Sequence, residues 1–340
     1  RDIHYADVLC ELTGAEMATV VNNNAAATMI ILNTLAKGKE VIVSRGQLVE
    51  IGGSFRMPDV METSGAVLRE VGTTNKTHLR DYANAINENT GAILRVHTSN
   101  YRIVGFTEEP SIQELTKLAA EHNLPVIDDL GSGALVDLKE YGLQTEPLVR
   151  ESIAAGVHVA CFSGDKLIGG PQCGIIVGKS DVLQRIKKNP LARALRIGKM
   201  TAAALEATLK LFLNPDKLNE YHPTYRMLSF TQAELEPRAR RMAENLSQML
   251  SGVASISVID GESQVGSGSV PTETLPTKVL SVIPRKTSAD RLAKDLRKGS
   301  KPVFTRIHQD AVLFDLRTIQ GDEDECVEQA ILIALATQTD

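Results

Sequence analysis

The sequence predicts an α/β protein with a large domain, built on a mostly parallel sheet, and a smaller C-terminal α/β domain. From residue 17 to residue 179, short apolar runs alternate with amphipathic helical patterns, as in a parallel sheet covered by helices on both faces. A second series of strand and helix patterns follows Asn214-Pro215. We therefore place the large domain at 1–213 and the small domain at 214–340.

The large domain begins with an amphipathic helix that ends near Gly14. Further along, Ser111 and Glu114 have the spacing of a capping box at a helix start. Strands are expected at 17–21, 40–43, 66–71, 92–97, 125–127, 157–162 and 173–178, and helices at 3–12, 28–36, 79–87, 111–122 and 199–213.

The small domain should be an antiparallel sheet covered by helices. A segment rich in Ser, Gly and Thr at 261–276 is expected to be a loop. Helices are expected at 230–250, 289–298 and 325–336, and strands at 253–259, 277–283 and 312–316.

One lysine, Lys166, lies between two predicted buried strands, after Ser163-Gly164-Asp165 and before a turn rich in Gly and Pro. A lysine held among small residues suits an amine that forms a Schiff base, and pyridoxal phosphate uses such a lysine. One alternative is an ordinary solvated loop lysine. Another is a serine nucleophile in a Ser-x-x-Lys pattern, but the companion Ser-Asp-Asn and Lys-Thr-Gly sequences are absent.

A polar elbow joins the first strand to the helix at 28–36 and contains Asn24, Ala25 and Ala26. Backbone amides at such a helix start favour an anion. Because the elbow lacks the Gly-x-Gly-x-x-Gly pattern, it suits one cofactor phosphate better than a dinucleotide. A plain capped helix is the alternative.

Polar residues also follow two predicted strands. Asp128 and Asp129 come after the strand at 125–127, and either carboxylate could pair with the pyridine nitrogen of the cofactor. Helix caps or metal ligands are the alternatives. After the strand at 92–97, we prefer Asn100 to His97 as a cofactor contact, because an amide can hold the ring oxygen without changing charge.

A basic segment at 182–195 leads to Arg196. If this segment is helical past Pro190, Arg193 and Arg196 share a face and could bind one small tetrahedral anion. A solvated basic face is the alternative.

The composition limits the function classes. A net charge of −5 gives no overall attraction to a polyanion, although local basic patches remain compatible with it. The four cysteines form no Cys-x-x-Cys pair, which favours a reducing cytoplasm and disfavours a disulfide framework or a metal site. No apolar run has the length of a membrane span, and no signal peptide is visible.

Several longer stretches resemble the bacterial selenocysteine synthase family, the seryl-tRNA selenium transferases. The resemblance runs almost end to end and is carried by Leu12-Thr13-Gly14-Ala15-Glu16, Val20-Val21-Asn22-Asn23-Asn24-Ala25-Ala26-Ala27, Val49-Glu50-Ile51-Gly52-Gly53-Ser54-Phe55-Arg56, Glu70-Val71-Gly72-Thr73-Thr74-Asn75-Lys76-Thr77, His97-Thr98-Ser99-Asn100-Tyr101, Phe162-Ser163-Gly164-Asp165-Lys166-Leu167 and Asp315-Leu316-Arg317-Thr318-Ile319.

This resemblance implies a fold type I pyridoxal phosphate enzyme of the aspartate aminotransferase type, with dimers that assemble into a decamer. It implies Lys166 as the cofactor lysine, Asp165 as its catalytic neighbour, and Arg193 and Arg196 as ligands of the selenium donor. The implied substrates are seryl-tRNA(Sec) and selenophosphate. The family's N-terminal tRNA-binding region has no counterpart in this sequence, so we expect poor selectivity for tRNA.

Two other function classes stay open. One is a related lyase that acts on a free amino acid or amino sugar acid without tRNA. The other is a binding protein of the same fold without catalysis, which the presence of Lys166 disfavours.

Overall fold

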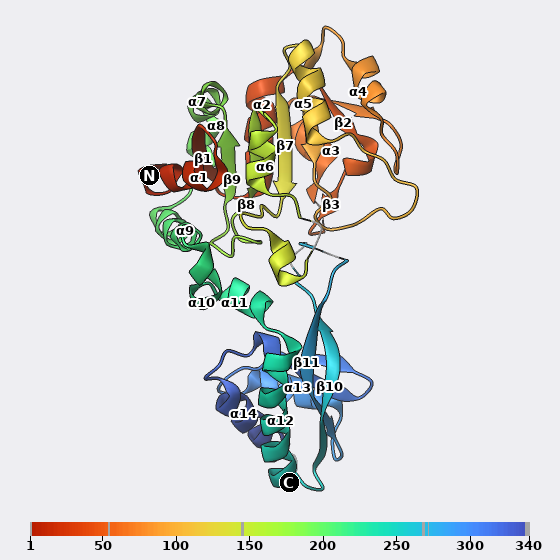
Figure 1. Ribbon diagram of the computed structural model, residues 1–340, viewed down its shortest axis with the longest axis vertical. Coiled ribbons are helices and arrows are strands. Elements are labelled where there is room, and N and C mark those ends of the chain that lie inside the picture. Colours follow the sequence, from red (N-terminus) through yellow and green to blue (C-terminus); the bar gives the residue numbers. More distant parts are fainter. Residues whose placement is uncertain (1, 54, 144–145, 267–268, 271, 337–340) are drawn as a thin grey trace. The chain divides into compact units, whose positions relative to one another are not determined.

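The structure is a computed structural model that describes residues 2–336, apart from 54, 144–145, 267–268 and 271. The chain divides into two compact units (Figure 1). The first contains Arg1–His222 and Val265–Glu273, and the second contains Pro223–Gln264 and Thr274–Asp340.

The division between the units falls after His222 rather than after residue 213. His222 is buried, and its Nε2 lies 2.8 Å from the carbonyl oxygen of Ile168. Its ring also packs edge-on against Phe212. These contacts hold the segment after the helix at 199–211 on the first unit.

A seven-stranded sheet forms the centre of the first unit, and in strand order it contains β1 (Met17–Val21), β9 (Gly174–Gly178), β8 (Val159–Ser163), β7 (Val126–Gly131), β6 (Thr90–Val96), β2 (Glu40–Ser44) and β5 (Val67–Val71). Strand β9 runs antiparallel to β1 and β8, while the pairs from β8 to β5 are parallel. The expected α/β class with a mostly parallel sheet is therefore confirmed.

Helices cover both faces of this sheet. The helices and short strands of the first unit are α1 (Ala6–Thr13), α2 (Asn24–Ala36), β3 (Glu50–Ile51), β4 (Phe55–Arg56), α3 (Met57–Ser64), α4 (Leu79–Ala85), α5 (Ile112–Glu121), α6 (Val149–Ala154), α7 (Ser180–Lys188), α8 (Leu191–Ala194), α9 (Lys199–Leu211) and α10 (Leu218–Tyr221). Helix α2 packs on one face, where Ile30 and Ile31 meet Cys161 and Ile176 in a buried core.

Local sequence explains several helix ends. Gly14 takes a left-handed conformation with φ of 76° at the end of α1, which a residue without Cβ adopts at little cost. The capping box of α5 is present, with the Ser111 and Glu114 side chains bonded to each other's backbone amides. These two expectations from the sequence are confirmed.

The second unit is a four-stranded antiparallel sheet with helices packed on it, as expected. Its strands, in sheet order, are β10 (Ala254–Ser263), β11 (Leu275–Pro284), β13 (Ala311–Asp315) and β12 (Arg306–His308), and its helices are α11 (Pro223–Ser229), α12 (Gln232–Met249), α13 (Ala289–Lys298) and α14 (Asp324–Ala336). Leu246, Leu280, Leu292 and Ile331 contribute to its core. Strands β10 and β11 extend into the two ends of the segment expected to be a loop, because their backbones pair as far as Ser263 and Leu275.

In the described part of the chain, every helix is too short or too polar to cross a lipid bilayer.

A close backbone approach joins the start of β9 to the elbow before α2. A Cβ atom at Gly174 would lie 2.1 Å from the carbonyl oxygen of Asn23 and 2.9 Å from the amide nitrogen of Asn24. Only a residue without a side chain therefore allows the elbow to lie against the sheet.

We predict that Gly174→Ala lowers the free energy of unfolding by about 1 to 3 kcal/mol, because the added methyl group overpacks this contact. Urea unfolding followed by circular dichroism measures the change. Gly321→Ala is the matched control, since no heavy atom lies within 4 Å of the added Cβ. Equal stability of the two variants would contradict the steric role of Gly174.

Candidate active site

A cavity of about 260 Å³ opens at the carboxyl ends of the parallel strands of the first unit. Ligands of open α/β sheets collect at this edge, because loops and helix N-termini converge there. The cavity is lined by Asn23, Asn24, Ala25, Val49, Ile51, Phe55, Met57, Val96, His97, Ser99, Asp129, Gly131, Ser163, Asp165, Lys166 and Gln172. Segments far apart in the sequence therefore form one site.

Lys166 is presented to this cavity by the connection between β8 and β9, residues 164–173. The Gly164 amide donates to the Cys173 carbonyl at 2.9 Å, and the Gly169 amide donates to the Lys166 carbonyl at 2.9 Å. A Cβ on Gly164 would lie 2.4 Å from the Cys173 sulfur, so the turn needs glycine there. Ser163 is the last residue of β8, and the exposed Asp165 also lines the cavity.

The thiol beside this turn is a poor competing nucleophile. Burial and the nearby Asp165 carboxylate raise the pKa of Cys173 to about 12. The thiol is therefore protonated at neutral pH. Cys173 does not line the cavity, whereas Lys166 does.

The two adjacent aspartates occupy opposite faces of β7, because side chains alternate along a strand. The sequence predicted that both residues follow the end of this strand. The prediction is wrong, because the strand continues to Gly131 and contains both residues. Asp129 lines the cavity and accepts hydrogen bonds from Asn24 Nδ2 and Thr28 Oγ1, each at 2.8 Å. Asp128 points to the other face, where Ser152 Oγ donates to it at 2.5 Å.

Both aspartates are buried, and burial raises the pKa of each carboxyl. For Asp129, the hydrogen bonds from Asn24, Thr28 and the Gly131 amide oppose this shift, as does the charge of Lys166. For Asp128, the groups that oppose the rise in pKa are Arg95, Ser152 and His97. Of the pair, only Asp129 faces the cavity, so the structure distinguishes two residues that the sequence could not.

The N-terminus of α2 forms another wall of the cavity, since the helix begins at Asn24 rather than at residue 28 and includes the three residues that the sequence placed in an elbow before it. The Asn23 side chain caps the helix by accepting from the Ala26 amide at 2.8 Å. Among the described residues, no hydrogen bond occupies the amides of Asn24 and Ala25, and both residues line the cavity. Ala26 is buried and does not line it, so two of the three elbow residues expected at the site are present there.

His97 lines the cavity, whereas Asn100 does not. The Asn100 amide donates to the carbonyl oxygen of Glu50 at 2.8 Å, which turns it away from the site. His97 Nε2 lies 3.5 Å from the Glu146 carboxylate, and Ser132 Oγ also donates to that carboxylate. The structure therefore places the histidine at the position for which the sequence had favoured the asparagine.

Glu146 is a functional candidate that sequence analysis missed. Burial alone would raise its pKa, but hydrogen bonds from His97, Ser132 and the Val270 amide outweigh burial and hold the pKa below the usual carboxyl range. Its carboxylate is therefore charged at neutral pH and can orient His97. No pattern around residue 146 predicts this, because all three partners are distant in sequence or lie in irregular segments.

A hydrophobic wall was also missed. Val49, Ile51, Phe55 and Met57 line the cavity from the β3–β4 hairpin and the start of α3. The quoted stretch from residue 49 to residue 56 was the available signal, since it combines apolar residues with a glycine turn. Such a wall excludes water and strengthens charge interactions inside the site.

Arg193 and Arg196 do not share a helical face. Helix α7 ends at Lys188, and α8 ends at Ala194, before Arg196. Arg196 instead forms a backbone bridge with Val21, directly before the elbow. Both side chains are exposed, and neither lines the Lys166 cavity.

No cluster of three or more His, Cys, Asp or Glu side chains suited to a metal ion occurs among the described residues. The four cysteines are free thiols.

The sequence model of the family described as SelA, L-seryl-tRNA selenium transferase, matches residues 1–320. The chain belongs to this family. A relative from Alkaliphilus metalliredigens (strain QYMF), named L-seryl-tRNA(Sec) selenium transferase, is 54% identical over 328 residues, covering 96% of this chain and 70% of the relative. A relative of the same name from Solidesulfovibrio magneticus is 53% identical, covering 100% of this chain and 73% of the relative.

A solved structure of D-glucosaminate-6-phosphate ammonia-lyase superimposes on this selenium transferase family member with a TM-score of 0.65. The sequences are 21% identical, and the alignment covers 98% of this chain and 85% of that structure. At this identity the likeness shows the fold alone. Together with membership of the family, it agrees with the fold type I architecture that the resemblance implied.

Proposed function

We propose that this protein is a pyridoxal phosphate-dependent L-seryl-tRNA(Sec) selenium transferase that converts seryl-tRNA(Sec) to selenocysteinyl-tRNA(Sec). The observation that carries the proposal is the meeting of Lys166, Asp129 and the Asn24–Ala25 elbow in one cavity of a chain from this family. The alternative, a lyase acting on a free amino acid or amino sugar acid without tRNA, is supported by the fold shared with D-glucosaminate-6-phosphate ammonia-lyase and by no sequence match at this level of identity.

The residues of the cavity fit pyridoxal phosphate. Amides at the N-terminus of α2, those of Asn24 and Ala25, would hold the phosphate, with the Ser163 hydroxyl beside them. The Asp129 carboxylate would pair with the ring nitrogen, and Lys166 would bind the aldehyde carbon. Asn24 Oδ1 is buried without a partner among the described residues, which is the kind of acceptor that a bound group can satisfy.

When bound, the cofactor supplies an electron sink for negative charge at the α-carbon of the seryl group. The Asp129 carboxylate makes this possible by holding a proton on the ring nitrogen. Burial disfavours the ionised form of the Asp129 carboxyl group. A positive charge beside it, such as a protonated ring nitrogen, would therefore be strongly stabilising. Asn24 and Thr28 hold the carboxylate oxygens in place for this contact.

With the seryl group bound, Lys166 Nζ would take the α-proton as a general base. Asp165 lines the same cavity, where its side chain would assist transfer of a proton to the β-hydroxyl, which leaves as water. Selenium from selenophosphate would then bond to the β-carbon while Lys166 returns the proton to the α-carbon, and a water molecule would take the phosphoryl group from selenium, releasing phosphate. The apolar wall of Val49, Ile51 and Phe55 limits access of bulk water to these steps.

The donor site and the assembly are further parts of the proposal. Arg193 and Arg196 bind selenophosphate, and their exposure outside the Lys166 cavity suits a donor site that another copy of the chain helps to complete. Copies of the chain form dimers that assemble into a decamer. The free cysteines suit a protein of the cytoplasm.

We predict that the purified protein absorbs visible light and that borohydride attaches the cofactor irreversibly to Lys166. Lys166→Ala should lose the absorption and reduce conversion of seryl-tRNA(Sec) by about 10²- to 10⁴-fold or more, as expected for loss of a general base. Peptide mapping after borohydride locates the label. Lys179→Ala, at the other end of the β8–β9 hairpin, should behave as the wild type. A label on a lysine other than Lys166 would overturn the assignment.

Asp129→Asn should reduce conversion of seryl-tRNA(Sec) roughly 10- to 100-fold, since a charge-assisted hydrogen bond is worth about 1.5 to 3 kcal/mol. It should also shift the visible absorption band, because the ring nitrogen loses its carboxylate. Asp128→Asn is the matched control: the adjacent buried carboxylate faces away from the cavity, so the absorption band should not move. A band shift in the Asp128 variant alone would reverse the two roles.

Arg193→Ala and Arg196→Ala should each raise the KM for selenophosphate roughly 10- to 100-fold, from loss of a charge-assisted contact worth about 1.5 to 3 kcal/mol. The visible spectrum should stay that of the wild type. Lys188→Ala removes an exposed cation from the neighbouring helix α7 and is the control. Loss of the cofactor spectrum in the arginine variants would show that these residues support the cofactor site instead.

A further inference from the structure

Helix α13 has a strongly segregated surface. Ala289, Leu292, Ala293 and Leu296 are buried against the second unit. The opposite face carries Arg291, Lys294 and Lys298, which recur at intervals of three and four residues and so share one side of the helix. A cationic stripe therefore runs along the exposed side of a ten-residue helix.

The charge around this helix contrasts with that of the whole chain. Residues 285–306 contain eight Lys or Arg against two Asp or Glu, whereas the chain carries a net charge of −5. Positive charge is thus concentrated in one segment of an acidic protein. Such a local concentration attracts an anionic partner even when the total charge is negative.

Most of these cations have no carboxylate partner in the part of the chain that the structure describes. Arg291 pairs with Asp295 at 2.8 Å, and Arg306 pairs with Asp315 at 3.3 Å. Among the described residues, Lys286, Lys294, Arg297 and Lys298 form no ion pair, and all four are exposed. Like charges placed this close repel one another and so do not stabilise the folded unit. An anionic partner outside the unit would relieve this repulsion.

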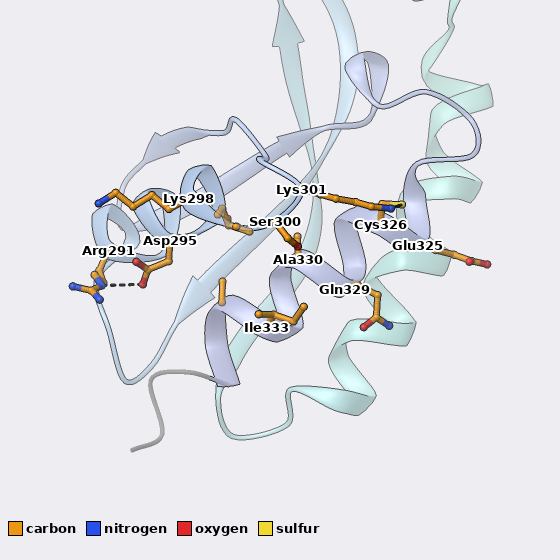
Figure 2. Close-up of a pocket in the computed structure, with 13 residues that line it drawn as sticks. Arg291, Asp295, Lys298, Ser300, Lys301, Glu325, Cys326, Gln329, Ala330 and Ile333 are labelled. Carbon is orange, nitrogen blue, oxygen red and sulfur yellow. Dashed lines mark hydrogen bonds and ion pairs between the residues drawn. The ribbon is translucent and has the colours of Figure 1, made fainter.

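A pocket of about 560 Å³ borders the stripe, between α13 and α14. Figure 2 shows the side chains of Arg291 and Lys298 at one side of this pocket and that of Glu325 at the other. Lys301 lies next to Cys326, with its Nζ 3.0 Å from the sulfur. The acidic side chain on α14 therefore limits the attractive surface to the α13 side and the residues that follow it.

We propose that the exposed face of α13, with the segment to Lys301, binds the sugar–phosphate backbone of the tRNA substrate. The inference rests on the proposed function, which makes an RNA the substrate. Lysine and arginine side chains spaced along one helix face suit a row of phosphates, whose counterions are released on binding. Exposed Phe304 follows the stripe in the chain and supplies a ring on which an unpaired base can stack.

The chemistry of the face favours RNA over an acidic protein. Protein interfaces are depleted in lysine and depend on buried aromatic and apolar anchors. The outward face of α13 instead consists of Lys294, Lys298 and the Arg291–Asp295 pair, with no aromatic residue in the helix. Backbone contacts carry no sequence information, so this surface adds affinity for tRNA without choosing among tRNAs.

The test uses the full chain and the variant Lys294→Gln/Arg297→Gln/Lys298→Gln. Glutamine keeps a helix propensity close to that of lysine and arginine, so α13 should remain folded. The control variant Lys37→Gln/Arg80→Gln/Lys117→Gln removes three exposed cations from the first unit and gives the same net charge. Binding of selenocysteine tRNA, serine tRNA and polyglutamate is measured as a function of salt concentration for all three proteins, and conversion of seryl-tRNA(Sec) is measured in parallel.

The proposal expects the α13 variant to bind both tRNAs roughly tenfold or more weakly at low salt, with the slope of log K against log salt reduced by about two to three. The control variant should keep most of the wild-type slope. Equal slopes for the two variants would overturn the proposal. Unchanged tRNA binding with loss of polyglutamate binding would assign the face to an acidic protein and overturn it too. If the wild type binds tRNA through α13 but converts no seryl-tRNA(Sec), the proposed function fails while the RNA-binding surface stands.

Discussion

The buried carboxylate of Asp129 is the constraint on which the rest of the site depends. A carboxylate away from water is costly unless hydrogen-bond donors and a positive charge surround it. Asn24 and Thr28, both on α2, supply two donors, and the Gly131 amide supplies a third. These bonds tie α2 to the middle of β7. The helix start, its capped elbow and the cavity edge are positioned as a consequence.

The reversed strand β9 serves the same arrangement from the other side. Because β9 runs antiparallel to β8, the connection between them, residues 164–173, lies at the edge where the parallel strands end. That connection brings Lys166 to the cavity, and Gly174 at the start of β9 leaves room for the elbow. Lys166 and the N-terminal residues of α2, Asn24 and Ala25, therefore face one cavity. Two close approaches require glycine, that of Gly164 to the Cys173 sulfur and that of Gly174 to the Asn23 carbonyl. They explain why small residues are concentrated in this stretch.

The two units differ in the chemistry of their surfaces. In the first, the functional groups lie in a partly apolar cavity, where Asp129 is buried and its interactions with nearby charges are strong. In the second, the cations of α13 are exposed, and water and salt weaken the attraction of each one to an anion. Binding by this surface would depend on several such contacts together. Catalysis needs the first kind of environment, because its charges must be held in place. Affinity for a long polyanion needs the second.

Sequence patterns determined much of this protein without further information. The α/β alternation, the start of α5 at its capping box and the end of α1 at Gly14 follow from local propensity and periodicity, which act within a few residues. The same holds for Lys166, since its two flanking apolar runs and the small residues around it are contiguous in the chain. These features need no knowledge of distant partners.

The tertiary structure alone decided which groups meet. Asp128 and Asp129 are equivalent in sequence, but β7 continues through both, and the alternation of the strand sends only Asp129 toward α2. His97 faces the cavity while Asn100 bonds to the Glu50 carbonyl, and Glu146 joins His97 from a distant segment. Arg193 and Arg196 separate because the chain leaves the helix after Ala194. Each outcome depends on where a strand or helix ends and on contacts between residues far apart in the chain, and these are set by packing rather than by local pattern.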